Sequence, residues 1–204
     1  MVNMIDVNGP ALQDRVKKIL MDPTREWPVI AAEATTTEKL YSSYIAPLAA
    51  IPAIATFIGY SIIGTTLPFI GTYRQPIVSG LVWAFVSYVI SMALVYVAAL
   101  IVDKLAPKFD STPSQIQALK LVAYSYTASW VAGVFFLIPV LGMIAILGSL
   151  YSIYLFYVGL PVMMKTPEAK VVPYMVVSAI VMIGLTLLVG LFTAVIAPGP
   201  NVFS

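Results

Sequence analysis

The sequence predicts an all-α polytopic integral membrane protein: a five-transmembrane-helix bundle with an N-terminal cytoplasmic amphipathic helix. Composition is the first reason, because 60% of the 204 residues are hydrophobic and only 10% are charged, against about 25% charged in soluble domains. The second is that the charges fall in short segments between long uncharged runs. We expect a cytoplasmic N-terminal segment at residues 1–39 and one membrane domain at residues 40–204.

The N-terminal segment contains a helical pattern of apolar residues. Leu12, Val16, Ile19 and Leu20 recur at the spacing of one helix face, with charged residues between them, which predicts an amphipathic helix. Two placements are open. The helix lies flat on the inner leaflet with Trp27 as an interfacial anchor, or it packs on the cytoplasmic loops.

The uncharged runs define the predicted spans. They cover residues 40–73, 75–102, 121–164 and 171–204. The third run is about twice the length that crosses a ~30 Å hydrocarbon core. Its middle reads LIPVLG, so we divide it at the turn signal Pro139 to Gly142. Five helices are therefore expected, near 40–66, 77–102, 115–138, 143–164 and 170–197.

Capping signals precede three of these helices on the side that carries the charges. Each is a threonine followed by a residue favoured in the first helical turn: Thr35 with Glu38, Thr112 with Pro113, and Thr166 with Pro167. Pro161 and Pro173 then lie inside the flanking helices, where we expect them to cause kinks.

The distribution of basic residues predicts the orientation. With the N-terminus inside, ten of the eleven Lys and Arg residues face the cytoplasm and only Arg74 faces outward. All nine acidic residues also fall on the inner side. The positive-inside rule then predicts a cytoplasmic N-terminus and an external C-terminus.

The residue inventory excludes several chemistries. The chain has no Cys and no His, so disulfides, thiolate nucleophiles, imidazole bases, haem and the usual zinc sites are absent. No phosphate-binding loop, nucleophile elbow or paired carboxylate is recognisable. We expect no enzymatic activity, no cofactor, no metal and no nucleic-acid partner. Because no ionisable residue falls in the interior of a predicted span, ion-coupled transport is disfavoured, whereas a neutral pore stays open.

Tyrosines and hydroxyls gather in two predicted neighbouring helices. YSYTASW starts at Tyr124 and YSIYLFY ends at Tyr157. In antiparallel helices these stretches lie at similar depth, so Tyr124, Tyr126, Thr127 and Ser129 could face Tyr154 and Tyr157. They would form either a polar groove for a lipid or partner helix, or hydrogen bonds that hold the bundle together.

The hairpin between the fourth and fifth predicted helices is the other candidate interaction surface. Its exposed charges are Lys165 and Lys170, with Pro167 between them to fix the loop's shape. The alternative is that these lysines only set topology.

Several stretches together resemble the bacterial branch of the Yip family, the Ypt/Rab-interacting membrane proteins. They are RVKKILMDPTREWPVIAAE, QALKLVAYSYTASWVAGVF and the run from LIPVLG to GLPVMMKTPEAK. One departure is Ala128, where related sequences often have proline after YSYT. The resemblance covers nearly the whole chain and implies five spans with a cytoplasmic N-terminus. It also implies a bacterial cytoplasmic-membrane protein, to which the Rab-linked role of eukaryotic members does not carry over.

These observations favour a membrane scaffold, adaptor or lipid-organising protein that acts through its cytoplasmic face. The expected partners are membrane lipids, and an unidentified protein or a second copy of the chain. The alternative function is a channel or transporter for a neutral or lipid-like solute.

Overall fold

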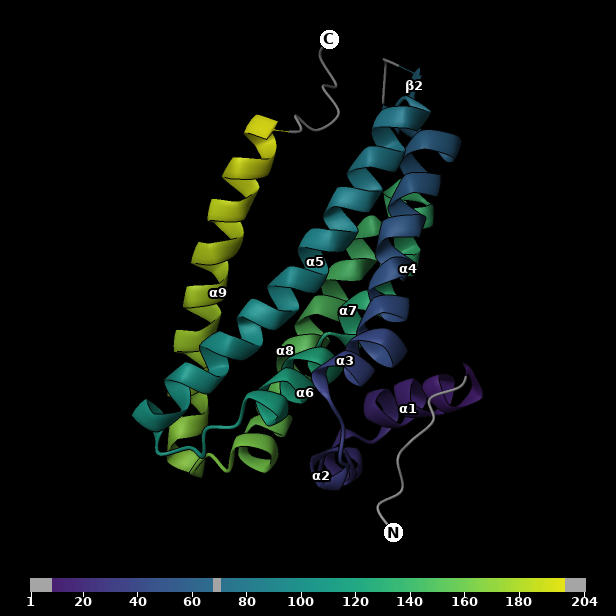
Figure 1. The fold of residues 1–204 in the computed structure, drawn as a ribbon. Coiled ribbons are helices and arrows are strands. Elements are labelled where there is room, and N and C mark those ends of the chain that lie inside the picture. Colours follow the sequence, from purple (N-terminus) through teal and green to yellow (C-terminus); the bar gives the residue numbers. More distant parts are fainter. Residues whose placement is uncertain (1–8, 68–70, 197–204) are drawn as a thin grey trace.

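The computed structural model describes residues 9–67 and 71–196, and helices make up most of this part of the chain (Figure 1). Short π-helical or 3-10 segments, labelled η, join or extend several α-helices. In chain order the helical elements are α1 (Gly9–Met21), α2 (Pro23–Ala32), α3 (Thr37–Leu40), η1 (Tyr41–Ile45), α4 (Ala46–Phe57), η2 (Ile58–Ile63), α5 (Ile77–Leu105), η3 (Ala106–Phe109), α6 (Gln115–Ser125), α7 (Thr127–Ala132), η4 (Gly133–Leu137), η5 (Pro139–Met143), α8 (Ile144–Met164) and α9 (Glu168–Ile196).

The first long helical run crosses the bundle and then turns back through a hairpin. It extends over Thr37–Ile63 and stops before Gly64, whose φ of +87° suits a residue without a Cβ. Strands β1 (Thr65–Leu67) and β2 (Gly71–Tyr73) follow and pair antiparallel. The predicted end of this span at residue 66 is therefore too late, because its last residues belong to a strand.

The predicted turn within the longest uncharged run is present. Ile138 is extended, and Pro139 opens the 3-10 turn η5 that leads into α8. The helix before it is not continuous, because α6 ends at Ser125 and α7 begins at Thr127. Pro161 and Pro173 lie inside α8 and α9 as expected. The predicted final residue of the last helix, 197, is outside the described residues.

The three capping predictions were wrong in detail. Helix α9 begins at Glu168, so Pro167 and not Thr166 directly precedes it, and the Thr166 hydroxyl lies 2.8 Å from that of Ser111. Thr36 caps α3 in place of Thr35, because its side chain accepts the hydrogen bond from the Lys39 amide at 3.2 Å. Ser114 occupies the N-cap position of α6 in place of Thr112, and its side chain makes no capping bond. The Thr112 amide is instead bonded to the Met164 carbonyl at 2.8 Å, which holds it in the connecting loop.

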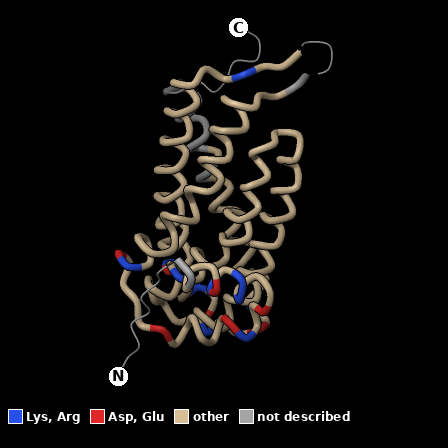
Figure 2. Tube along the Cα trace, turned by 90° about the vertical axis from the view of Figure 1, so that its right-hand side faces the viewer, with Lys and Arg blue, Asp and Glu red and all other residues tan. Residues whose placement is uncertain are grey.

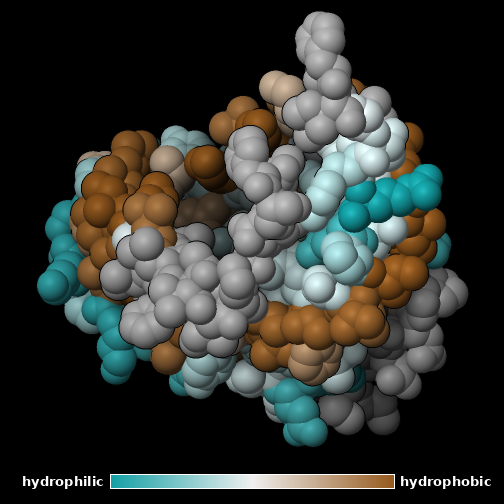
Figure 3. All heavy atoms as spheres, turned by 90° about the horizontal axis from the view of Figure 1, so that it is seen from above, coloured by the Kyte–Doolittle hydropathy of each residue, from teal (hydrophilic) through white to brown (hydrophobic). Residues whose placement is uncertain are grey.

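Large apolar side chains cover the outside of the long helices. Among the described residues, three helical runs are long and apolar enough to cross a membrane: Thr37–Ile63, Ile77–Phe109 and Pro139–Met164. Exposed residues such as Leu81, Phe85 and Leu147 would meet water in a soluble protein, but they suit a hydrocarbon environment. Brown apolar side chains are prominent in the view from above (Figure 3). The protein is an all-α membrane protein.

Apart from Arg74, the described charges are sorted to one end of the bundle (Figure 2). Helices α1 and α2 lie at this end, as do the loop after α5 and the start of α9 (Figure 1). Arg74 follows β2 at the opposite end, where its Nε donates to the Ile63 carbonyl at 3.3 Å. The largest fully buried side chains include Trp27, Tyr44 and Tyr174, so the best-packed core is also near the charged end.

Candidate functional site

The first two helices fold against the charged end of the bundle. Ile19 is fully buried, and Leu12, Val16 and Leu20 pack partly buried against the core. The Leu20 carbonyl accepts a hydrogen bond of 2.8 Å from the Tyr151 hydroxyl of α8. The apolar face of α1 is thus turned to other helices of the protein in this structure.

Trp27 anchors α2 in the interior. Its side chain is fully buried and makes an edge-on contact with the ring of Tyr124, 6.4 Å away between ring centroids. Gly159 of α8 makes room for it, because a Cβ at that position would lie 2.6 Å from the indole ring. Trp27 is therefore a packing residue here and does not occupy the interfacial position considered from sequence.

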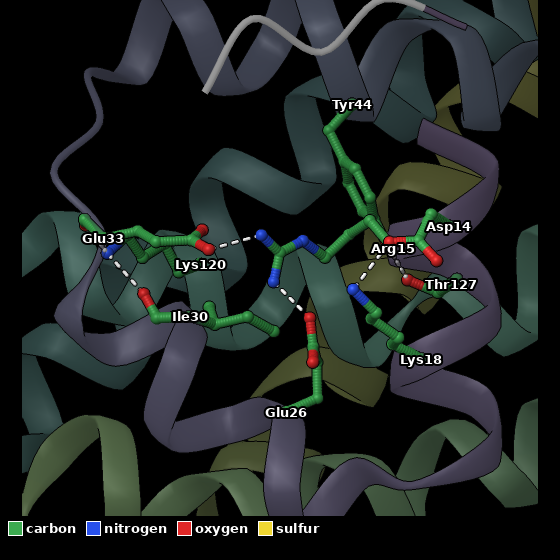
Figure 4. Close-up of polar contacts among 9 residues, drawn as sticks. All are labelled: Asp14, Arg15, Lys18, Glu26, Ile30, Glu33, Tyr44, Lys120 and Thr127. Carbon is green, nitrogen blue, oxygen red and sulfur yellow. Dashed lines mark hydrogen bonds and ion pairs between the residues drawn. The ribbon is translucent and has the colours of Figure 1, made fainter. Parts of the chain in front are cut away.

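A buried ion-pair network joins α1 to α2 (Figure 4). Arg15 donates to Glu26 through one terminal nitrogen and to Glu33 through the other. The side chains of Arg15 and Glu26 are only 13% and 9% exposed. Burial lowers the pKa of Arg15, but the attraction of Glu33 and Glu26 outweighs it, so the pKa lies above its ordinary value. The guanidinium keeps its charge and clamps both carboxylates.

Lys120 extends this network into the bundle. It lies on α6, is only 3% exposed, and donates to the Ile30 carbonyl at 2.8 Å and the Glu33 carbonyl at 2.5 Å. These carbonyls lie at the end of α2, where helical C=O groups lack intrahelical partners. Lys120 therefore ties the N-terminal helices to α6.

A cavity of about 270 Å³ opens beside these residues. Arg15, Glu26, Glu33 and Lys120 line it, together with the pair Asp14–Lys18, whose N–O distance is 2.6 Å. The hydrogen bond from Lys18 lowers the pKa of Asp14. Lys39 also lines the cavity, and its ammonium has no partner among the described residues. Tyr44, Tyr124 and Leu40 supply an apolar part of the wall.

The hairpin after α8 is tied to a neighbouring loop. Lys165 is exposed with a φ of 52°, and Lys170 forms an ion pair with Asp110. The Thr166 hydroxyl lies 2.8 Å from that of Ser111. Pro167, which lies between Lys165 and Lys170 in the chain, is exposed. Shape at this hairpin thus depends on the loop before α6 as well as on proline.

The four tyrosines predicted to face one another point to different surroundings. Tyr124 is 8% exposed, and its ring lies 4.3 Å from that of Tyr44 between centroids. Tyr126 contacts Trp130, whereas Tyr154 and Tyr157 are 45% and 44% exposed on α8.

The hydroxyl contact between these two helical stretches is made by serines. The Ser129 and Ser152 side-chain oxygens are 2.9 Å apart. Packing of small residues, and not of tyrosines, therefore joins α7 to α8 at this depth. Tyr124 instead belongs to the wall of the charged cavity.

Sequence reasoning missed the four charges at the centre of the site, Arg15, Glu26, Glu33 and Lys120. Arg15 was only one of the charged residues between the apolar positions of the first helix, and Lys120 only one of the ten basic residues placed on the cytoplasmic side. The sequence signal that could have found them is the spacing of Glu26 and Glu33, which are seven residues apart and so lie on one face of α2, two turns from each other.

Comparisons with known proteins agree with the fold and the composition. The family model described as the Yip1 domain matches residues 17–191. Inner membrane protein YohC of Escherichia coli (strain K12) is 29% identical over 142 residues, which cover 68% of this chain and 73% of that protein. The protein of the same name from Escherichia coli O6:H1 matches equally. No solved structure matches.

Proposed function

Since the chain belongs to the Yip1 domain family, we propose that it is a non-enzymatic membrane scaffold, adaptor or lipid-organising protein whose working surface is its charged end. In this proposal five helices span a bacterial cytoplasmic membrane, with the N-terminus and the charged end in the cytoplasm. Residues 1–39 form a cytoplasmic segment and residues 40–204 the membrane domain.

The proposal rests on the separation of charged and apolar side chains on the surface. The described charges are concentrated at one end (Figure 2), whereas the long helices expose apolar side chains such as Phe85, Leu147 and Ile183. Specific polar recognition is therefore possible mainly at the charged end. The exposed side chains there include Lys104, Lys165 and Glu168.

The positive-inside rule supports the orientation, because the end with the Lys and Arg excess is the expected cytoplasmic end. The relatives named inner membrane protein YohC support the location. Lys165, Pro167 and the exposed tyrosines Tyr154 and Tyr157 are proposed contact residues for lipid or protein. Lys170 has a structural partner in Asp110, so we give it a supporting role in hairpin shape.

Site-specific photo-crosslinking in cells tests the proposal. A photoreactive amino acid is placed at Lys104 or Lys165, and at Arg74 as a control on the opposite end. We expect a defined crosslinked protein or lipid, identified by mass spectrometry, at the first two positions and not at Arg74. Equal products at all three positions would contradict a working surface at the charged end. Solute flux through the purified protein in liposomes would contradict the scaffold or adaptor role and favour a channel or transporter.

A further inference from the structure

The cavity lined by residues of α1 and α2 has both charged and apolar walls. It lies beside the start of the first long helical run. Its lining contains four basic side chains, Arg15, Lys18, Lys39 and Lys120, and three acidic ones, Asp14, Glu26 and Glu33. The net charge of the lining is therefore +1. A ligand that carries a single negative charge would balance it.

Hydrogen-bond accounting identifies the groups that are still available. Arg15 is engaged by Glu26 and Glu33, and Lys18 by Asp14. Lys39 has no partner among the described residues, and Lys120 uses its ammonium for two carbonyls. An ammonium has three N–H donors, so Lys120 retains one. Unlike Lys18, whose charge is paired with Asp14, Lys39 and Lys120 have no carboxylate partner among the described residues and can donate to an anion.

Position and size restrict the class of anion. Lys39 is in α3 and Tyr44 in η1, the first turns of the apolar run Thr37–Ile63, so the cavity lies where membrane headgroups would meet the protein. Its volume of about 270 Å³ lies just below the usual range for ligand pockets, which is on the order of 300–1,000 Å³. A headgroup fits this volume better than a whole lipid. Leu40 and Tyr124 offer apolar contact to the adjoining carbons.

We propose that this cavity binds the phosphodiester monoanion of a phospholipid headgroup, held by Lys39 at the mouth and by Lys120 in the interior. The Arg15–Glu26–Glu33 network fixes the wall against which the headgroup rests. The proposal deepens the proposed function by naming a lipid ligand at the charged end. It requires no protein partner, so a test with purified components can fail without the adaptor role failing.

The test measures lipid retained by the purified full chain. The protein is reconstituted in bilayers of phosphatidylglycerol mixed with a phosphate-free galactolipid, extracted in mild detergent and examined by native mass spectrometry. We expect selective retention of phosphatidylglycerol by the wild type. Lys39→Glu should lower that retention by about tenfold, because it replaces a charge-assisted hydrogen bond with repulsion.

Two further variants separate the cavity from general surface charge. Lys17→Glu makes the same charge change on the exposed side of α1, outside the cavity lining, and should leave retention unchanged. Ala34→Trp fills the exposed mouth of the cavity and should abolish selective retention while the melting temperature stays near that of the wild type.

The lipid source is distinguished by adding glycerophosphoglycerol, which has the phosphodiester without acyl chains. Displacement of the retained lipid supports recognition of the headgroup alone, and retention despite it supports recognition of the intact lipid. Three results would overturn the proposal: equal retention of the galactolipid, equal loss in Lys39→Glu and Lys17→Glu, or full retention in a folded Ala34→Trp protein. In each case the cavity is not a binding site for a phospholipid phosphodiester.

Discussion

The Tyr44 hydroxyl lies 2.6 Å from the Thr127 side-chain oxygen, and both residues are almost completely buried. Tyr44 belongs to η1 and Thr127 begins α7, directly after the interruption at Tyr126. The bond therefore joins the first long helix to the point where the third helical stretch is broken. A buried polar pair of this kind is costly to break on one side only.

Thr127→Val should lower the free energy of unfolding by about 1–3 kcal/mol, because it leaves the Tyr44 hydroxyl buried without a partner. Tyr44→Phe combined with Thr127→Val should recover part of this loss, since both polar groups are then gone. Chemical denaturation in detergent, followed by tryptophan fluorescence, measures the cycle. Additive losses in the double variant would show that the two hydroxyls contribute independently.

Arg15→Met should loosen the N-terminal helices. It removes the cation between Glu26 and Glu33 and leaves two carboxylates close together with little solvent, which we expect to cost about 3 kcal/mol or more. The Tyr151 bond to the Leu20 carbonyl is retained, so the bundle should stay folded. Hydrogen exchange should accelerate in α1 and α2.

Lys17→Met on the exposed side of the same helix is the control for that experiment. Its amide exchange should match that of the wild type. If the two variants exchange alike, the ion-pair network does not hold α1 and α2 in place.

Gly159→Ala should destabilise the protein by about 1–3 kcal/mol through overpacking. The new Cβ would lie 2.6 Å from the Trp27 ring and 2.7 Å from a methyl carbon of Leu121. Gly184→Ala in α9 is the matched control, because a Cβ there meets nothing within 4 Å. Thermal unfolding should show a lower melting temperature for the first variant alone. A drop of the same size in both would mean that the loss comes from the helix backbone.

Local signals account for the parts of the fold that were predicted. Uncharged runs and the Pro139 turn depend on composition and on residues adjacent in the chain, so the helical stretches were found within a few residues. The start of α3 was misplaced because Thr35 and Thr36 are both good capping residues, and only the chain path decides between them.

The candidate site depends on contacts that local patterns do not encode. Arg15, Glu33 and Lys120 come from three separate segments, and each alone is typical of a solvated rim. To predict whether the tyrosines face one another, the rotation of α8 about its own axis must be known. The packing of Ser152 and Gly159 determines this rotation. A helix that is apolar on all sides carries little information about that rotation.

The orientation of the charged end can be tested directly because the chain contains no Cys. Single variants Lys108→Cys, Lys165→Cys and Arg74→Cys each place a thiol at an exposed position, the first two at the charged end and the third after β2. The excess of Lys and Arg predicts that the charged end is cytoplasmic. A membrane-impermeant maleimide should therefore label Arg74→Cys in cells whose cytoplasmic membrane is intact and whose outer membrane has been made permeable. The other two variants should be labelled only after the cytoplasmic membrane is opened.

Labelling of Lys165→Cys together with Arg74→Cys before that step would contradict the separation of the two ends by the bilayer. Labelling of Lys165→Cys and Lys108→Cys without Arg74→Cys would reverse the proposed orientation.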